Sequence, residues 1–186
     1  MRIKSLTISN FRRYSSAVTI EFDNLTAFVG KNDAGKSSVL EALDIFFNDA
    51  KGCIKLDKDD INKTESENGN NEISIAVCFE ELPDNVVIDA TNETTLESEY
   101  LLNENQQLEI VKKYPNAGSA KVFIRAYHPT SPNCSDLLLK KDNELRKLIS
   151  SQSIECADQT RNAVMRKAIW EHFSNDLQFA MMDIDV

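Results

Sequence analysis

The residue types best suited to chemistry lie in one short stretch, GKNDAGKS at residues 30–37. It fits G-x-x-x-x-G-K-[ST], the P-loop pattern, in which backbone N–H groups surround phosphate oxygens. Gly30 and Gly35 allow the backbone to approach an anion closely. Lys36 would reach the β- and γ-phosphates, and the Ser37 hydroxyl would be a ligand of Mg²⁺. A chance glycine turn before a helix would fit the same letters, so the flanking elements must decide.

The flanking segments have the patterns that a P-loop requires. The apolar run LTAFV at residues 25–29 predicts a buried strand that leads into the loop. The segment that follows, residues 36–47, carries an apolar stripe at helical spacing, formed by Val39, Leu40, Leu43, Phe46 and Phe47. A helix that begins at the loop would direct its N-terminus at the phosphates. Strand, glycine loop and helix therefore occur in the required order, and the sequence predicts nucleotide binding.

Further strands are predicted on both sides of this unit. Alternating apolar residues indicate strands at residues 2–8, 18–22, 73–79, 99–102, 108–114 and 121–128. The turns between them are short, which favours antiparallel pairing, including pairing of 18–22 with 25–29. Small kinases and GTPases differ, because their sheets are mainly parallel.

The remaining segments are polar or helical in character. Residues 49–71 are rich in Asp, Asn, Lys and Glu and predict a mobile acidic loop. A calcium loop is excluded, because Asn62 and Asn68 stand where its glycine and its terminal glutamate belong. Helices are expected over residues 137–149 and 158–173. We therefore expect an N-terminal lobe at 1–130, with antiparallel strands at 72–128, and a helical segment at 131–186.

Composition narrows the class of protein. The 186 residues suit one domain, or one domain with an insertion, and the net charge of -9 argues against a broad nucleic-acid-binding surface. Four widely spaced cysteines fit neither a disulfide framework nor a zinc site, which indicates reduced thiols and a cytoplasmic location. His128 and His172 have no partners at ligand spacing and are expected to be structural or surface residues. The sequence has no apolar run of membrane-spanning length, so we expect no membrane partner.

Two stretches near the N-terminus form a recognisable combination: ISNFR at residues 8–12 and GKNDAGKSSVLEAL at residues 30–43. Together with the hairpin expected between them, they resemble the ABC-type ATPase heads of the RecF, SMC and OLD families. Asn32 inside the loop narrows the resemblance beyond a generic P-loop. The pair Asp33-Ala34 is closer to OLD-like and Gabija-type ATPases than to SMC proteins, so the OLD-like resemblance ranks first.

The resemblance implies an α/β fold, the N-terminal portion of an ABC-type P-loop ATPase head with an antiparallel β-rich subdomain followed by helices. It implies ATP and Mg²⁺ as cofactors, with Ser37 on the metal. In these families the Asn-Phe-Arg turn lies near the nucleotide, so Arg12 would touch phosphate or base. A surface arginine beside a packed Phe11 is an equal alternative. The residues expected to bind nucleotide are Gly30, Asn32, Asp33, Ala34, Gly35, Lys36, Ser37, Ser38 and Arg12.

The catalytic half of such a head is not recognisable in this sequence. It contains no signature motif resembling LSGG, and the nearest Walker B candidate, FAMMD at residues 179–183, has Ile184 where the catalytic glutamate belongs. Gln152 and Gln159 follow no convincing strand, so neither is assigned to a Q-loop. We therefore expect no catalytic residues here, and an N-terminal part of a longer protein that alone turns over little ATP.

The resemblance also implies partners for the full-length protein. ATP would join two heads in a homodimer or higher oligomer, and such proteins act on DNA, often through a C-terminal Toprim nuclease, in phage defence or repair. Two alternatives remain open: a RecF- or SMC-like DNA repair ATPase, and a nucleotide-sensing scaffold that hydrolyses little ATP and recruits an effector protein. A Walker B glutamate downstream would favour an ATPase over the scaffold.

Overall fold

A computed structural model describes residues 1–31, 35–89 and 92–185. The chain forms two compact units, each assembled from segments that are distant in sequence. Unit one contains residues 1–81 and 109–124, and unit two contains residues 82–108 and 125–185. The lobe boundary expected after residue 130 falls inside unit two and stays a prediction.

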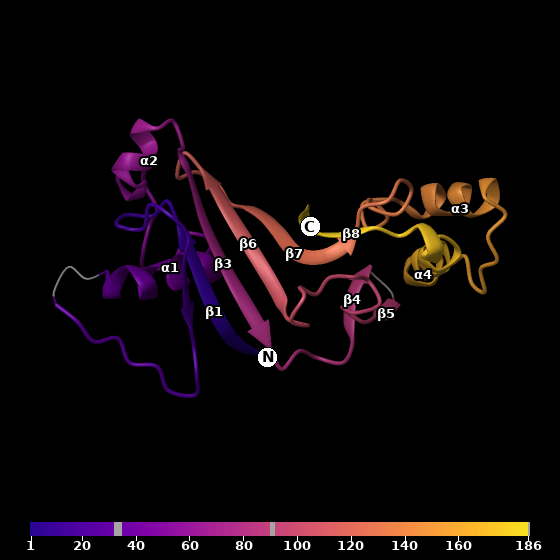
Figure 1. The fold of residues 1–186 in the computed structure, drawn as a ribbon, viewed down its shortest axis with the longest axis horizontal. Coiled ribbons are helices and arrows are strands. Elements are labelled where there is room, and N and C mark those ends of the chain that lie inside the picture. Colours follow the sequence, from indigo (N-terminus) through magenta and orange to yellow (C-terminus); the bar gives the residue numbers. More distant parts are fainter. Residues whose placement is uncertain (32–34, 90–91, 186) are drawn as a thin grey trace. The chain divides into compact units, whose positions relative to one another are not determined.

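A six-stranded antiparallel sheet has the strand order β2-β1-β3-β6-β7-β8. Figure 1 labels β1, β3, β6, β7 and β8 of this sheet. Strand β1 pairs antiparallel with both β2 and β3, and Leu6 lies opposite Ile20 on one side and Val77 on the other. Strands β1, β2, β3, β6 and β7 confirm the alternation predicted from the sequence, whereas β8 lies in the 131–186 segment predicted to be helical. Their bounds are β1 (Arg2–Ser9), β2 (Val18–Glu21), β3 (Glu72–Glu80), β6 (Leu108–Pro115), β7 (Lys121–Pro129) and β8 (Phe179–Asp185).

Helix α1 (Lys36–Asn48) packs against β1 and β3 in unit one. Its buried face differs from the predicted stripe, because Leu40 and Phe47 are 59% and 52% exposed. The buried apolar residues are Val39, Ala42, Ile45 and Phe46. Strand β6 holds the C-terminal end of the helix. There the Lys112 ammonium donates to the Phe46 carbonyl (2.8 Å) and the Tyr114 hydroxyl to the Ile45 carbonyl (3.3 Å). A cation at these carbonyls also interacts favourably with the negative, C-terminal end of the helix dipole.

The predicted strand at residues 25–29 is wrong, as is its pairing with 18–22. Residues 25–29 have no strand structure, and Leu25 and Val29 are 89% and 93% exposed. A strand needs a neighbour to take its backbone hydrogen bonds. Among the described residues, β2 stands at the end of the sheet order and has only β1 beside it. Residues 25–29 therefore remain outside the sheet of the described residues, although the run is apolar.

The acidic segment predicted as a loop at 49–71 contains two short helices instead, a 3₁₀ helix (Lys58–Asp60) and α2 (Lys63–Glu67). Side chains cap both, since the Asp57 and Asn62 oxygens accept from backbone N–H groups of the turns that follow. The segment is also paired to the Asn-Phe-Arg turn through a β-bridge between Phe11 and Ile61. Local capping and this pairing order a segment that has few apolar residues to bury.

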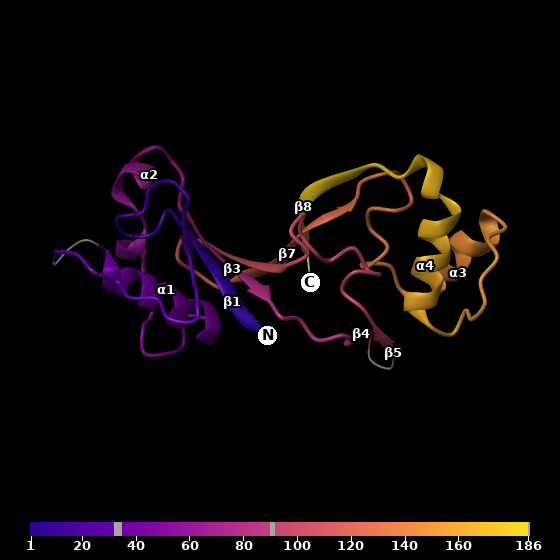
Figure 2. The same cartoon turned by 60° about the horizontal axis from the view of Figure 1, so that its bottom comes forward.

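Unit two combines a hairpin of β4 (Val86–Asp89) and β5 (Asn92–Thr94) with helices α3 (Asp142–Ser151) and α4 (Asn162–His172). The two helices contact each other, and Figure 2 shows them beside one another. A 3₁₀ helix (Ser174–Asp176) follows α4. The core residues of the unit are Cys134, Leu137, Leu145, Ile149, Ile154, Met165, Ile169 and Trp170. No helix in the described part of the chain is long and apolar enough to cross a bilayer.

Two predictions in unit two are wrong in detail. Residues 99–102, predicted as a strand, form turn and irregular structure, and Glu99 is buried in an ion pair with Arg166. Both helices also begin later than predicted, because residues 137–141 and 158–161 are not helical. The sequence pattern could not reveal that a charged residue at position 99 belongs to the interior.

Candidate functional site

The candidate nucleotide site lies where the glycine loop meets α1. Gly35 directly precedes the helix and has a φ of 86°, the left-handed conformation that favours glycine. A Cβ atom at this position would lie 2.9 Å from the Tyr14 hydroxyl oxygen. The same hydroxyl donates a hydrogen bond to the Gly35 carbonyl oxygen (3.2 Å). Gly35 is therefore required both by backbone conformation and by the close approach of Tyr14.

The N-terminus of α1 is suited to an anion. No side chain caps it, and no acidic residue lies in its first turn. The first N–H groups of a helix have no partners within the helix, and the dipole favours negative charge there. Ser37 is exposed and Ser38 is buried, so only the first of these two hydroxyls faces outward from the fold. These properties fit a phosphate group with an associated cation.

Lys36 is already turned toward the loop. Its ammonium donates to the Gly30 carbonyl oxygen (2.7 Å) and the Lys31 carbonyl oxygen (2.6 Å). Carbonyl oxygens at these positions act as acceptors for the cation in the way that phosphate oxygens would. The Lys36 ammonium and the uncapped N–H groups at the start of α1 are therefore hydrogen-bond donors that fit the triphosphate of a nucleotide. Asn32, Asp33 and Ala34, which complete the predicted loop, lie outside the described residues.

Arg12 is held by two carboxylates. Its Nε atom donates to an Asp60 carboxylate oxygen (2.8 Å), and a guanidinium nitrogen forms an ion pair with Glu41 of α1. The guanidinium also lies over the Phe11 ring, 4.9 Å from its centroid. These contacts connect the Asn-Phe-Arg turn to α1 and to the acidic segment. The nucleotide contact predicted for Arg12 stays a prediction.

Asn10 and Asn62 fix the shape of this turn. The Asn10 amide donates to the Asn70 and Glu72 carbonyls (both 3.0 Å), and the Asn62 amide donates to the Arg12 carbonyl (2.6 Å). Asn10 is 1% exposed and has a φ of 54°. Sequence reasoning identified the turn but missed Tyr14 and Glu41 as its contacts to the loop and α1. No spacing rule connects residues so far apart in the chain.

The other residues considered from the sequence lie elsewhere in the structure. Asp183 of the rejected Walker B candidate is on β8, in an ion pair with Arg125 (2.7 Å), and Ile184 is buried. None of the four cysteines, which all lie in the described part of the chain, is in a disulfide. His128 is fully buried, whereas His172 is exposed on α4. No group of three potential metal-ligating side chains occurs among the described residues.

Comparison with known proteins assigns the chain to a family. A model of the AAA ATPase domain, AAA_15, matches residues 1–185, and the chain belongs to this family. No curated protein matches. One solved structure that matches part of the chain comes from work described as "Structural biochemistry of ATP-driven dimerization and DNA stimulated activation of SMC ATPases". It is 19% identical with a TM-score of 0.42, and the match covers 67% of this chain and 69% of that one.

The family and the α/β architecture agree with the predicted ABC-type P-loop ATPase head. The antiparallel strands, the glycine loop and α1 occur in the predicted order, with the loop entering from an extended exposed segment rather than from a strand. The chain is therefore an ATPase domain of the AAA_15 type.

Proposed function

We propose that this chain binds ATP·Mg²⁺ through residues 30–38. The observation that carries the proposal is the open N-terminus of α1, with the Lys36 ammonium held at the carbonyls of Gly30 and Lys31. On binding, Lys36 would exchange these carbonyls for β- and γ-phosphate oxygens. The N–H groups of the first turn of α1 would complete the cradle.

The remaining predicted residues have defined roles in the proposal. The Ser37 hydroxyl would ligate Mg²⁺, whose charge neutralises the β- and γ-phosphates. Asn32, Asp33 and Ala34 would contribute loop geometry and backbone N–H groups, and Arg12 would supply a second cation. The buried Ser38 would support the start of the helix from within the fold.

We further propose that the full-length protein is a cytoplasmic OLD-like ATPase that acts on DNA in phage defence, with a nuclease outside this chain. The loop letters Asp33-Ala34 and the Asn-Phe-Arg turn support this choice within the ABC-type heads. ATP would join two heads, and a signature motif from the partner would reach the phosphates. An effector protein and DNA would bind through other regions.

The test is ATP·Mg²⁺ binding and turnover by this chain beside the full-length protein, each with Lys36→Ala. Lys36→Ala should abolish binding while the thermal unfolding temperature stays unchanged, because the lysine contacts loop carbonyls rather than the core. Lys55→Ala is the matched control, since this exposed lysine lies outside the loop. We expect turnover in the full-length protein only.

Three outcomes would change the proposal. Unchanged binding in Lys36→Ala would exclude the P-loop as the nucleotide site. Unfolding of that variant would assign the lysine a structural role instead. Binding without turnover in both forms would favour the nucleotide-sensing scaffold over an ATP-driven nuclease.

A further inference from the structure

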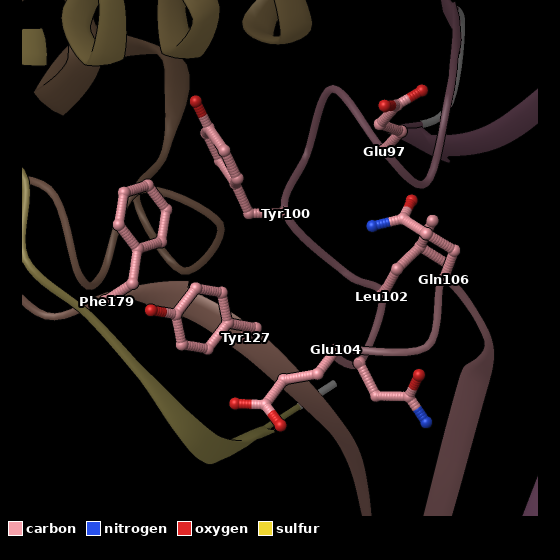
Figure 3. A pocket seen from close by; sticks show the side chains of 8 residues that line it. Glu97, Tyr100, Leu102, Glu104, Gln106, Tyr127 and Phe179 are labelled. Atoms are coloured by element: carbon pink, nitrogen blue, oxygen red, sulfur yellow. The ribbon is translucent and has the colours of Figure 1, made fainter.

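Unit two contains a cavity of about 530 Å³ that the nucleotide proposal does not use. Three aromatic rings form one side of it, from the 97–106 loop, β7 and the start of β8 (Figure 3). Glu97, Glu104 and Gln106 extend from the same loop around the opening. The aromatic residues are Tyr100, Tyr127 and Phe179.

The aromatic side is a continuous surface. The Tyr127 and Phe179 rings are stacked, with centroids 5.4 Å apart and an interplanar angle of 20°. Tyr100 lies 5.3 Å from Phe179 at 58°. Tyr127 is 42% exposed, so part of its ring is open to a ligand in the cavity. An aromatic ring face is negative and attracts a cation placed above it.

The walls of the cavity are held by hydrogen bonds that each involve a backbone group. The Leu102 carbonyl accepts from the Tyr127 N–H (2.9 Å), and the Tyr100 carbonyl accepts from the ring of His128 (2.9 Å). The Asn103 side-chain oxygen accepts from the N–H groups of Asn105 and Gln107 (both 3.0 Å) and closes the turn that carries Glu104. The side chains around the cavity therefore project from a fixed backbone, which lowers the entropic cost of binding.

The charge of the cavity has one sign. Of the described residues that line it, none carries a positive charge. Within the described part of the chain, neither Glu97 nor Glu104 is in an ion pair. Carboxylates and aromatic faces together favour a cation and disfavour a phosphate. Among biological cations, a guanidinium matches both features, because it stacks flat on a ring and donates two parallel bonds to a carboxylate.

We propose that this cavity binds an arginine side chain presented by a basic segment of a partner protein. The guanidinium stacks on Tyr127 and pairs with Glu104, while Glu97 favours neighbouring positive charge on the same segment. The negative charge of the whole chain adds long-range attraction for such a segment. A cavity of this volume admits an extended arginine side chain together with part of its backbone.

The experiment titrates N-acetyl-Gly-Arg-Gly-amide into the ¹⁵N-labelled chain and follows amide shifts by NMR. We expect saturable shifts at residues 100–106, 127 and 179, with a Kd on the order of 1 mM for one side chain. The citrulline peptide, which keeps the shape but lacks the charge, should bind at least ten-fold more weakly. The lysine peptide should also bind more weakly, because it cannot stack or form paired hydrogen bonds.

Variants locate the site and separate it from folding. Glu104→Gln and Tyr127→Leu should each weaken binding of the arginine peptide several-fold. Glu155→Gln, a substitution of another exposed glutamate of unit two, should not change binding. Equal binding of the citrulline peptide, tighter binding of free arginine or of adenosine, or shifts that avoid the cavity would each overturn the proposal. Because two variants alter different features of the cavity, misfolding of one would leave the other to decide.

Discussion

At the residue scale, Tyr14 and Gly35 explain how the phosphate loop is joined to the rest of unit one. The tyrosine donates to the Gly35 carbonyl and occupies the space beside its Cα. Tyr14 follows the Asn-Phe-Arg turn, so the turn contacts the loop through this neighbour, whereas Arg12 contacts α1 and the acidic segment. A family motif read from the sequence includes the arginine and leaves the tyrosine out, although the tyrosine makes the hydrogen bond to the loop.

Gly35→Ala should destabilise the chain more than Gly69→Ala does, although both glycines have nearly the same backbone conformation. Their φ values are 86° and 85°, but a Cβ at Gly69 would meet no atom within 4 Å. Gly69→Ala should therefore cost only the left-handed strain, about 1–2 kcal/mol. Gly35→Ala should cost the same strain and, in addition, the free energy needed to displace Tyr14. The measurement is the free energy of unfolding in urea.

Tyr14→Phe completes the comparison, because it removes the hydroxyl that a Cβ at position 35 would meet. The excess cost of Gly35→Ala should shrink in the Tyr14→Phe background. Equal costs at the two glycines would show that Tyr14 does not constrain the loop.

At the element scale, the sequence predicted structure well where local pattern decides. Alternation predicted β1, β3, β6 and β7, because each has apolar side chains to bury at period two. It failed at residues 25–29, where an apolar run lacks a neighbouring strand, and at residue 99. Glu99 is buried because Arg166, 67 residues away, donates two hydrogen bonds to it (2.6 and 2.8 Å). Such long-range partners leave no trace in a local pattern.

The candidate site shows the same limit. The residue types and spacing of the P-loop predicted Gly35, Lys36 and the start of α1 correctly. They could not predict that the Arg12 guanidinium engages Glu41 and Asp60, since that contact depends on how the acidic segment folds back onto the turn. Motifs describe chemistry that is local in sequence, whereas the partners of a motif residue depend on tertiary packing.

Strand β7 carries His128 into the aromatic cluster of unit two. The Tyr100 carbonyl can only accept, so the Nδ1 atom donates to it (2.9 Å) and Nε2 is the unprotonated nitrogen, buried without a hydrogen-bond partner. Burial lowers the pKa of His128 below its ordinary value of 6.5, against smaller opposing effects of the Tyr100 carbonyl and Glu99. The folded state therefore requires a neutral imidazole at this position.

The free energy of unfolding should fall as the pH decreases from 7 to 5.5. In this range the unfolded state takes up a proton at His128 before the folded state does, so stability is full above pH 6.5 and is lost below it. The limiting slope is about 1.4 kcal/mol per pH unit for one group. Urea unfolding at each pH measures it.

His128→Asn keeps a donor for the Tyr100 carbonyl and removes the titration, so the curve of stability against pH should become flatter. His172→Asn serves as the control, because this second histidine is exposed on α4 and its removal should leave the slope intact. A slope unaffected by His128→Asn would assign the pH dependence to other groups.

At the scale of the whole molecule, acidic residues outnumber basic ones, 30 against 21. Many of the basic side chains are also engaged with carboxylates. These ion pairs include Arg2–Glu80, Arg12–Asp60, Lys112–Asp49, Arg125–Asp183, Lys140–Asp136 and Arg166–Glu99. The net charge of -9 opposes contact with DNA phosphates, whose neutralisation by cations is the main source of non-specific affinity for DNA.

We therefore expect this chain to bind duplex DNA more weakly than the range of about 10⁻⁴ to 10⁻⁶ M typical of non-specific DNA-binding proteins at physiological salt. Fluorescence anisotropy of a labelled duplex at low and at physiological salt, with and without ATP·Mg²⁺, measures this. Lowering the salt should not produce binding, because a chain with a net charge of -9 is repelled by the phosphates that it would have to contact to release counterions. Saturation at micromolar protein that weakens steeply with salt would contradict the expectation and reveal a local basic surface. Absence of binding would support the proposal that DNA reaches the full-length protein through other regions.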